Sequence, residues 1–186
     1  MIKYLKIQNF TAFDTLDINF SNGVNLFIGE NGTGKTHILK LLYAACDITK
    51  SKKSFAEKIN DVFYPSDKQI GRLVKRAQKS TSGTVEIGRE LPDGKTSFIK
   101  LALTSHMLTP NKAKHTGATK LWLENPIESV FIPVKDMMAN APSFRSLYSI
   151  RDIHFEEVYA DIIDRAFLPA LKGPIDHQRG KLLKIL

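Results

Sequence analysis

Residues 29–36 read Gly29-Glu30-Asn31-Gly32-Thr33-Gly34-Lys35-Thr36 and match the pattern G-x-x-x-x-G-K-[ST] in full. The glycines let the backbone turn tightly, so that successive N–H groups and the start of the following helix face phosphate oxygens. Lys35 adds a positive charge for the β- and γ-phosphates, and the Thr36 hydroxyl is a ligand for nucleotide-bound Mg²⁺. The stretch therefore predicts a nucleotide-phosphate site made by these eight residues and by His37, which follows them directly.

The sequence on either side of this loop decides whether the match is meaningful, because a short pattern also occurs by chance. Upstream, the apolar run Val24–Ile28 is typical of a short buried strand. Downstream, apolar residues recur at the spacing of a helix packed against a sheet. These residues are Ile38, Leu39, Leu41, Leu42, Ala45 and Cys46. The order of strand, loop and helix favours a phosphate-binding loop over a glycine-rich turn without a ligand.

Two further strands are expected before the loop. Residues Ile2–Ile7 form the first strand, and Phe13–Phe20 form the second. In the second, Leu16 and Ile18 alternate with polar residues, which is the period of a half-buried antiparallel strand. Most nucleotide kinases and GTPases begin with the strand that leads into the loop, so this order indicates a different type of P-loop protein.

Three features of the N-terminal part belong together. They are the opening Lys6-Ile7-Gln8-Asn9-Phe10-Thr11-Ala12-Phe13, the strand that ends near Phe20, and the loop at residues 29–36. They resemble the start of an ABC-type ATPase head of the SMC, RecF and OLD-like class, including the AAA-15 type, over roughly the first 50 residues. The resemblance implies an α/β P-loop NTPase fold with an antiparallel β lobe and helices, ATP as the nucleotide, and Mg²⁺ as its cofactor.

The same resemblance implies which residues form the wall of the nucleotide site. In such heads an Asn-Phe segment lies near the adenine and the ribose. The candidates in this chain are Asn9, Phe10, Thr11 and Phe13. Phe10 and Phe13 are equally compatible with core aromatics of an antiparallel sheet, so the sequence leaves both interpretations open for them.

Composition indicates a soluble globular chain. The 186 residues are 42% hydrophobic and 25% charged, which suffices for one core, in one domain or in one domain with a small lobe. No apolar run approaches the roughly 20 residues of a membrane span, and the N-terminus lacks a signal-peptide pattern, so we expect a cytoplasmic location and no membrane contact. Cys46 is the only cysteine and the five histidines show no ligand spacing, so we expect a free buried thiol and no separate metal site.

Residues 50–79 are strongly basic. They contain nine lysines and arginines against three acidic residues, and this net charge of +6 accounts for most of the chain's formal +8. SMC-like and RecF-like heads bind DNA through basic surfaces, so a DNA contact is one expectation for this segment, and a solvated face without a ligand is the other. The segment has few aromatic residues, which argues against stacking on single-stranded bases.

The next part of the chain is expected to form β-structure. Residues Thr84–Arg89 and Ser97–Thr104 predict an antiparallel hairpin, because Leu91-Pro92-Asp93-Gly94-Lys95 between them has the chemistry of a turn. The other elements expected here are a loop at His106–Thr119 and two short strands at Lys120–Leu123 and Ser129–Val134.

The C-terminal part is expected to be helical. Apolar residues in His154–Leu168 follow helical spacing and predict a core-facing stripe, with Asp161 and Asp164 facing solvent. The stripe consists of Phe155, Val158, Tyr159, Ile162, Ile163, Ala166 and Phe167. A last helix is expected from Pro174 onwards. The whole chain is interpreted as one partial ATPase head with four segments, at residues 1–49, 50–80, 81–134 and 135–186.

Two motifs that an ABC-type ATPase needs for hydrolysis are not recognisable in residues 1–186. One is a signature loop, for which Lys79–Gly83 is the nearest match, although it precedes a strand. The other is an apolar strand ending in Asp-Glu, and Asp136 is not followed by Glu. We therefore expect the N-terminal half of a head, with weak or no hydrolysis alone and unknown catalytic residues. We also expect an exposed apolar sheet edge and pairing as a homodimer or with a C-terminal-half partner.

Three classes of function are compatible with these features. The first is ATP binding within an ATPase head that acts on DNA or in bacterial defence. The second is a non-catalytic interaction or regulatory protein built from a truncated head. The third is another P-loop enzyme, a kinase or a GTPase, but Asn111-Lys112-Ala113-Lys114 lacks the final Asp of a guanine-binding motif.

Overall fold

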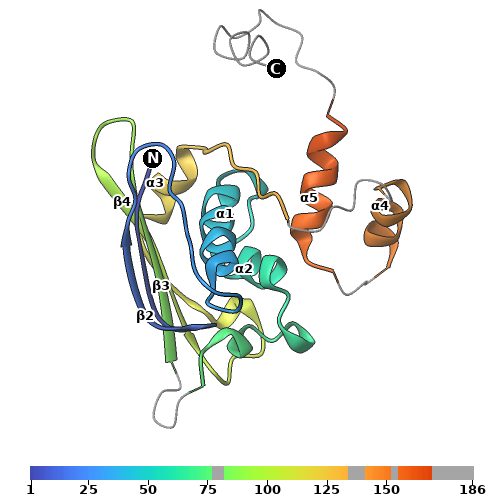
Figure 1. Cartoon of the computed structure of the whole chain (residues 1–186), viewed down its shortest axis with the longest axis horizontal. Coiled ribbons are helices and arrows are strands. Elements are labelled where there is room, and N and C mark those ends of the chain that lie inside the picture. Colours follow the sequence, from blue (N-terminus) through green and yellow to red (C-terminus); the bar gives the residue numbers. More distant parts are fainter. Residues whose placement is uncertain (77–81, 134–140, 152–154, 169–186) are drawn as a thin grey trace, which may run out of the picture.

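A computed structural model of the chain describes residues 1–76, 82–133, 141–151 and 155–168. The helix expected from Pro174, the Lys79–Thr81 part of the signature match and Asp136 lie outside these residues. In the described part, helices cover one face of an antiparallel sheet, and two further helices lie beyond them (Figure 1). No helix in these ranges is both long and apolar enough to cross a membrane.

The sheet has five strands in the order β2-β1-β3-β4-β5, and every neighbouring pair is antiparallel. The strands are β1 (Ile2–Phe10), β2 (Phe13–Asn19), β3 (Ser82–Glu90), β4 (Thr96–Thr104) and β5 (Lys114–Gly117). The two strands expected before the loop and the expected hairpin are confirmed. In β1, Leu5 and Ile7 are buried whereas Lys6 and Gln8 are exposed, which is the alternation of a sheet with one covered face.

The β3–β4 hairpin has a register set by its turn. Gly94 in the turn has φ 79°, a left-handed value that favours glycine. Val85 pairs with Leu101, and Ile87 pairs with Ile99. All four of these strand residues are buried, so a shift by one residue would move the whole apolar set to the solvent face.

The helical elements lie between and after these strands. They are α1 (Lys35–Ser51), α2 (Phe55–Phe63), α3 (Thr119–Glu124), α4 (Ala141–Ile150) and α5 (Glu157–Ala166), with the short 3-10 turns η1 (Ser66–Lys68), η2 (Ile70–Leu73) and η3 (Pro110–Lys112). α1 confirms the helix expected after the loop. α2 begins with a capping box, in which the Ser54 hydroxyl accepts from the Glu57 N–H and the Glu57 carboxylate accepts from the Ser54 N–H.

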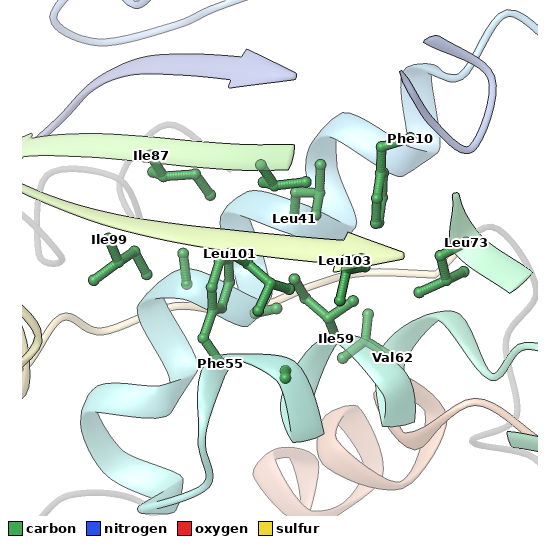
Figure 2. Close-up of a cluster of buried hydrophobic side chains, with 14 of the residues drawn as sticks. Phe10, Leu41, Phe55, Ile59, Val62, Leu73, Ile87, Ile99, Leu101 and Leu103 are labelled. Carbon is green, nitrogen blue, oxygen red and sulfur yellow. The ribbon is translucent and has the colours of Figure 1, made fainter. Parts of the chain in front are cut away.

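The main core lies between the sheet and the helices α1 and α2 (Figure 2). It contains Ile87, Ile99 and Leu101 from the strands, with Leu41 from α1 and Ile59 from α2. Each of these five side chains is at most 3% exposed. Burial of this apolar surface fixes the helix that begins at the phosphate-binding loop against the sheet.

Two expected strands do not form ladders in the structure. Val24–Ile28 lies in no strand and pairs with no described residue, and Val24, Leu26 and Ile28 are exposed. The expectation of a buried strand there is therefore wrong. The expectation of a strand at Ser129–Val134 fails in the same way for its described residues 129–133. An apolar run becomes a buried strand only where neighbouring elements cover it.

The region between residues 106 and 123 also differs from expectation. The expected loop at His106–Thr119 contains β5, which pairs with β4. The expected strand at Lys120–Leu123 is part of α3. The reason lies in Trp122, which is fully buried and whose Nε1 donates to the Ala45 carbonyl at 2.7 Å. This tertiary contact outweighs the local β-propensity of the segment.

α5 confirms the helix expected at His154–Leu168, but it faces its neighbours differently. Val158 is buried as expected, whereas Phe167 is exposed. Asp164 is exposed as expected, but Asp161 faces inward, because its carboxylate lies 2.9 Å from the buried ammonium of Lys58 on α2. The sequence pattern of α5 alone could not show that its neighbours present cations.

Candidate nucleotide site

The glycine-rich loop at residues 29–36 leads into the N-terminus of α1. Gly32 and Gly34 have φ values of 83° and 94°, so both positions need the conformational freedom of glycine. The Lys35 ammonium donates to the carbonyl oxygens of Gly29 and Glu30, at 2.7 and 2.5 Å. These contacts hold the positive charge within the loop, where a phosphate group would be neutralised.

The N-terminus of α1 is suited to an anion. Its N-cap residue is Gly34, so no side chain caps the helix, and its first turn contains no acidic residue. The first N–H groups and the positive end of the helix dipole both favour a negative charge at this point. Thr36 is exposed in the first turn. Together with Lys35, these features fit a nucleoside triphosphate and its Mg²⁺.

The Phe13 ring at the start of β2 packs against the loop. A Cβ atom at Gly34 would lie only 2.5 Å from this ring. Gly34 is therefore required by its backbone conformation and also by the space that Phe13 occupies. Phe13 is half-buried, so it supports the loop from the side of the antiparallel sheet.

The turn Asn9–Thr11 between β1 and β2 is held in a fixed conformation. Asn9 and Thr11 have φ values of 46° and 50°, which are uncommon for residues other than glycine. The Thr11 N–H donates to the Leu73 carbonyl at 2.7 Å, and the Lys75 N–H donates to the Asn9 carbonyl at 2.8 Å. These bonds tie the turn to the end of η2 and to the chain directly after it, and so give the site a rigid edge.

His37 connects α1 to this turn. Its Nδ1 lies 3.0 Å from Thr11 Oγ1, and its ring lies against Phe63 with the centroids 5.5 Å apart. Burial lowers the pKa of His37, the nearby Lys40 cation lowers it further, and the Glu156 carboxylate opposes this shift. A neutral imidazole follows at neutral pH. His37 is therefore placed to position Thr11.

The structure distinguishes between the two interpretations of Phe10. Its side chain is fully buried, and its ring meets the Phe63 ring edge-on with the centroids 5.5 Å apart. This favours a core role for Phe10 over a place in the wall of the site. Asn9 and Thr11 are partly exposed, and their contact with a nucleotide stays a prediction.

Two parts of the site were missed by the sequence analysis. Phe63 at the end of α2 contacts both Phe10 and His37. Lys75 holds the turn through its backbone, and its ammonium lies 2.7 Å from the Asp14 carboxylate. Both residues lie far from the loop in sequence, so only their three-dimensional contacts reveal that they support it.

Most described cations of the basic segment are matched by carboxylates. The ion-paired residues are Lys50, Lys53, Lys58, Arg72 and Lys75. Lys52, Lys68 and Arg76 are exposed. Residues 50–76 therefore do not present the continuous basic surface that the composition of the segment indicated.

Other chemically reactive groups near α1 lack the arrangement of a metal site. Cys46 is a free, buried thiol as expected, and burial raises its pKa to about 11. Among the described residues, no group of three or more His, Cys, Asp or Glu side chains is arranged to hold a metal ion. Binding of nucleotide-associated Mg²⁺ by Thr36 stays a prediction.

Residues 1–159 match the model of the AAA ATPase domain family (AAA_15). The chain therefore belongs to this family of P-loop ATPases, and the resemblance to the SMC and RecF-like class is confirmed. Among its relatives is the DNA replication and repair protein RecF of Clostridium kluyveri, which is 46% identical over 57 residues, or 31% of this chain and 15% of that protein.

Two streptococcal relatives with the same name match longer stretches. The RecF protein of Streptococcus suis is 35% identical over 92 residues, which is 50% of this chain and 24% of that protein. The RecF protein of Streptococcus gordonii is 26% identical over 125 residues, which is 67% of this chain and 32% of that protein. The chain thus spans less than a third of the length of these curated relatives.

A solved structure is also similar to this chain. It is described as the recombination mediator protein RecF-ATP in the RecFOR pathway, with a TM-score of 0.47 and 18% identity. The similarity covers 82% of this chain and 40% of that chain.

Proposed function

We propose that this chain is the ATP-binding part of a RecF-type ATPase head that acts on DNA. The observation that carries the proposal is the loop at residues 29–36, where Lys35 and the uncapped N-terminus of α1 fit a triphosphate. Membership of the AAA ATPase domain family supports ATP as the nucleotide. The relatives named for DNA replication and repair support a role in DNA transactions.

The residues of the site have distinct roles in this proposal. The N–H groups at the start of α1 bind phosphate oxygens, Lys35 neutralises their charge, and Thr36 holds Mg²⁺. The bound Mg²⁺ supplies the remaining neutralisation of the triphosphate. His37 keeps Thr11 in place, so that the turn Asn9–Thr11 forms the edge of the site next to the nucleoside.

In this proposal the chain binds ATP without fast turnover. Phosphoryl transfer depends on positioned charges, among them an acidic residue that polarises the attacking water. Residues 1–186 contain no recognisable strand ending in Asp-Glu and no recognisable signature loop. Hydrolysis therefore requires that another part of an assembled head supplies these two motifs.

Calorimetric titration with ATP and with GTP, each in the presence of Mg²⁺, tests the proposal. ATP is expected to bind, and Lys35→Ala is expected to weaken binding by at least about tenfold. Lys95→Ala is a suitable control, because Lys95 is an exposed lysine in the β3–β4 turn. GTP binding as tight as that of ATP would favour another P-loop enzyme. Absence of binding by the folded chain would favour a non-catalytic interaction protein.

Phosphate release in the same samples separates binding from catalysis. Release near the background is expected for the chain alone. Robust release that Lys35→Ala abolishes would show that the chain carries its own acidic catalytic residue, and it would contradict the hydrolysis part of the proposal.

A further inference from the structure

The ring of Phe63, the last residue of α2, supports the turn Asn9–Thr11 in two ways. It meets the Phe10 ring edge-on, and it also contacts the His37 ring, with both centroid distances at 5.5 Å. Phe10 is the middle residue of the turn, and His37 Nδ1 lies 3.0 Å from Thr11 Oγ1. Phe63 therefore supports the turn at its centre and, through His37, at its end.

The conformation of this turn needs such support. Asn9 and Thr11 have φ values of 46° and 50°, and residues other than glycine keep such values only where their surroundings hold them. The backbone hydrogen bonds to Leu73 and Lys75 fix the main chain of the turn. The Thr11 side chain is oriented by its contact with His37. The direction of the Thr11 hydroxyl thus depends on where the His37 ring lies.

Phe63 is itself held in place. The preceding residue, Val62, is fully buried in the core, and the Tyr64 N–H closes the end of α2 by donating to the Asn60 carbonyl at 2.9 Å. The Lys40 ammonium lies 5.5 Å from the centroid of the Phe63 ring, which is a favourable contact between a cation and an aromatic face. α2 thus places a fixed aromatic ring beside the first turns of α1.

In the proposed site, the two ends of ATP are bound by different parts of the chain. The loop at residues 29–36 binds the triphosphate, and Lys35 is held there by carbonyl oxygens of the loop itself. The turn Asn9–Thr11 lies next to the nucleoside. A change that displaces this turn therefore weakens the binding of the nucleoside and leaves the triphosphate contacts in place.

We propose that Phe63 is a positioning residue that sets the affinity of the site for the nucleoside part of ATP. Its ring holds Phe10 and His37, and His37 in turn orients Thr11 at the nucleoside edge. This inference rests on the proposed function. Phe63 needs no contact with the nucleotide for this role, because it acts through the turn.

Calorimetric titration with ATP and with methyl triphosphate, each with Mg²⁺, tests the proposal. Methyl triphosphate carries the triphosphate of ATP with a methyl group in place of the nucleoside. The unmodified chain is expected to bind ATP more tightly than methyl triphosphate. Phe63→Leu removes the ring and keeps an apolar side chain. It is expected to weaken ATP binding about fivefold, the effect of one misplaced hydrogen bond, and to leave methyl triphosphate binding unchanged.

Two further variants are matched controls. Phe63→Tyr keeps the aromatic ring and is expected to bind ATP as tightly as the unmodified chain. Phe55→Leu makes the same substitution at the first residue of α2, where Phe55 is buried in the core (Figure 2). It is expected to lower the free energy of unfolding without changing the ratio of the two affinities.

The nitrogen chemical shifts of the His37 ring give a second readout, without any nucleotide. His37→Gln identifies the His37 signals by their loss. Phe63→Leu is expected to move these shifts towards those of Thr11→Val, which lacks the hydroxyl beside Nδ1. Phe55→Leu is expected to leave them unchanged. Unchanged His37 shifts in folded Phe63→Leu would overturn the inference.

The titrations distinguish this inference from the proposed function. Three results would overturn the inference and leave the triphosphate site in place. One is equal binding of ATP and methyl triphosphate by the unmodified chain. Another is equal weakening of both ligands by Phe63→Leu, and the third is ATP binding that Phe63→Leu leaves unchanged. A folded, unmodified chain that binds neither ligand would instead overturn the proposed function, and with it this inference.

Discussion

The Lys58 ammonium on α2 lies 2.9 Å from the Asp161 carboxylate on α5, and the Lys58 side chain is 1% exposed. The same ammonium lies 2.9 Å from Asp47 on α1 and 3.5 Å from Glu157 on α5. Burial lowers the pKa of Lys58, but the carboxylates of Asp161 and Glu157 raise it by more, so the net shift is upward. One buried cation thus joins three helices.

Lys58→Met is expected to destabilise the fold by about 3–5 kcal/mol, because it leaves buried carboxylates without their cation. Urea unfolding followed by circular dichroism measures this change. Lys120→Met is the control, since Lys120 is a highly exposed lysine on α3, and it is expected to change stability by less than about 0.5 kcal/mol. Equal stability of the two variants would mean that α5 does not depend on the buried cation.

Gly34→Ala is expected to destabilise the chain more than Gly94→Ala. Both glycines have positive φ, at 94° and 79°, so both alanine variants carry about 1–2 kcal/mol of backbone strain. Only Gly34 also faces the Phe13 ring, whereas a Cβ atom at Gly94 meets nothing within 4 Å. Urea unfolding measures the free energy of unfolding of both variants, and the difference between them gives the cost of the contact with Phe13.

A double variant checks the cause of that difference. Gly34→Ala combined with Phe13→Ala opens the space beside residue 34, so the strain from the ring should disappear while the strain from φ remains. If Gly34→Ala and Gly94→Ala are equally destabilising, the Phe13 ring moves aside without cost and the proposed crowding is wrong.

The sequence correctly predicted those strands and helices that are determined by the pattern of their own residues. β1, β2 and the β3–β4 hairpin follow from alternation and turn chemistry, and α1 follows from helical spacing after the loop. The loop itself was recognisable because phosphate binding requires glycines and Lys35 at fixed positions. The exposure of Val24–Ile28 could not be predicted in this way, because the apolar run is the same whether or not neighbouring strands cover it.

The other errors arose from contacts between distant residues. α3 forms where Trp122 donates to the Ala45 carbonyl, and a six-residue segment carries no signal of that partner. Asp161 and Glu157 on α5 face inward because they form ion pairs with Lys58 and Lys53. In the site, the support that Phe63 gives to His37 was hidden for the same reason.

Protonation of His37 is expected to reduce stability at acidic pH. Its pKa is lowered in the folded chain, first by burial and then by the Lys40 cation, so the unfolded chain binds the proton more readily. This contribution to stability is fully present above about pH 6.5 and is lost as the pH falls from there towards the folded pKa. His37→Gln should therefore show a smaller loss of unfolding free energy between pH 7.5 and 5.5. Urea unfolding at both pH values measures this loss of unfolding free energy. A loss as large in His37→Gln as in the unmodified chain would contradict the role of His37.

Binding of this chain alone to duplex DNA is expected to depend only weakly on salt. Of the described cations in residues 50–76, Lys52 and Arg76 are exposed and take part in none of the ion pairs of this segment. Each phosphate neutralised contributes about −0.9 to the slope of log K against log salt concentration, so these two residues predict a slope of about −2 or shallower. Fluorescence anisotropy with a labelled duplex, at NaCl concentrations from about 50 to about 200 mM, measures this slope. A slope near −7 would mean that DNA breaks the ion pairs and that the cations of the whole segment contact phosphates. In that case the double variant Lys52→Ala, Arg76→Ala would remove only a small part of the slope.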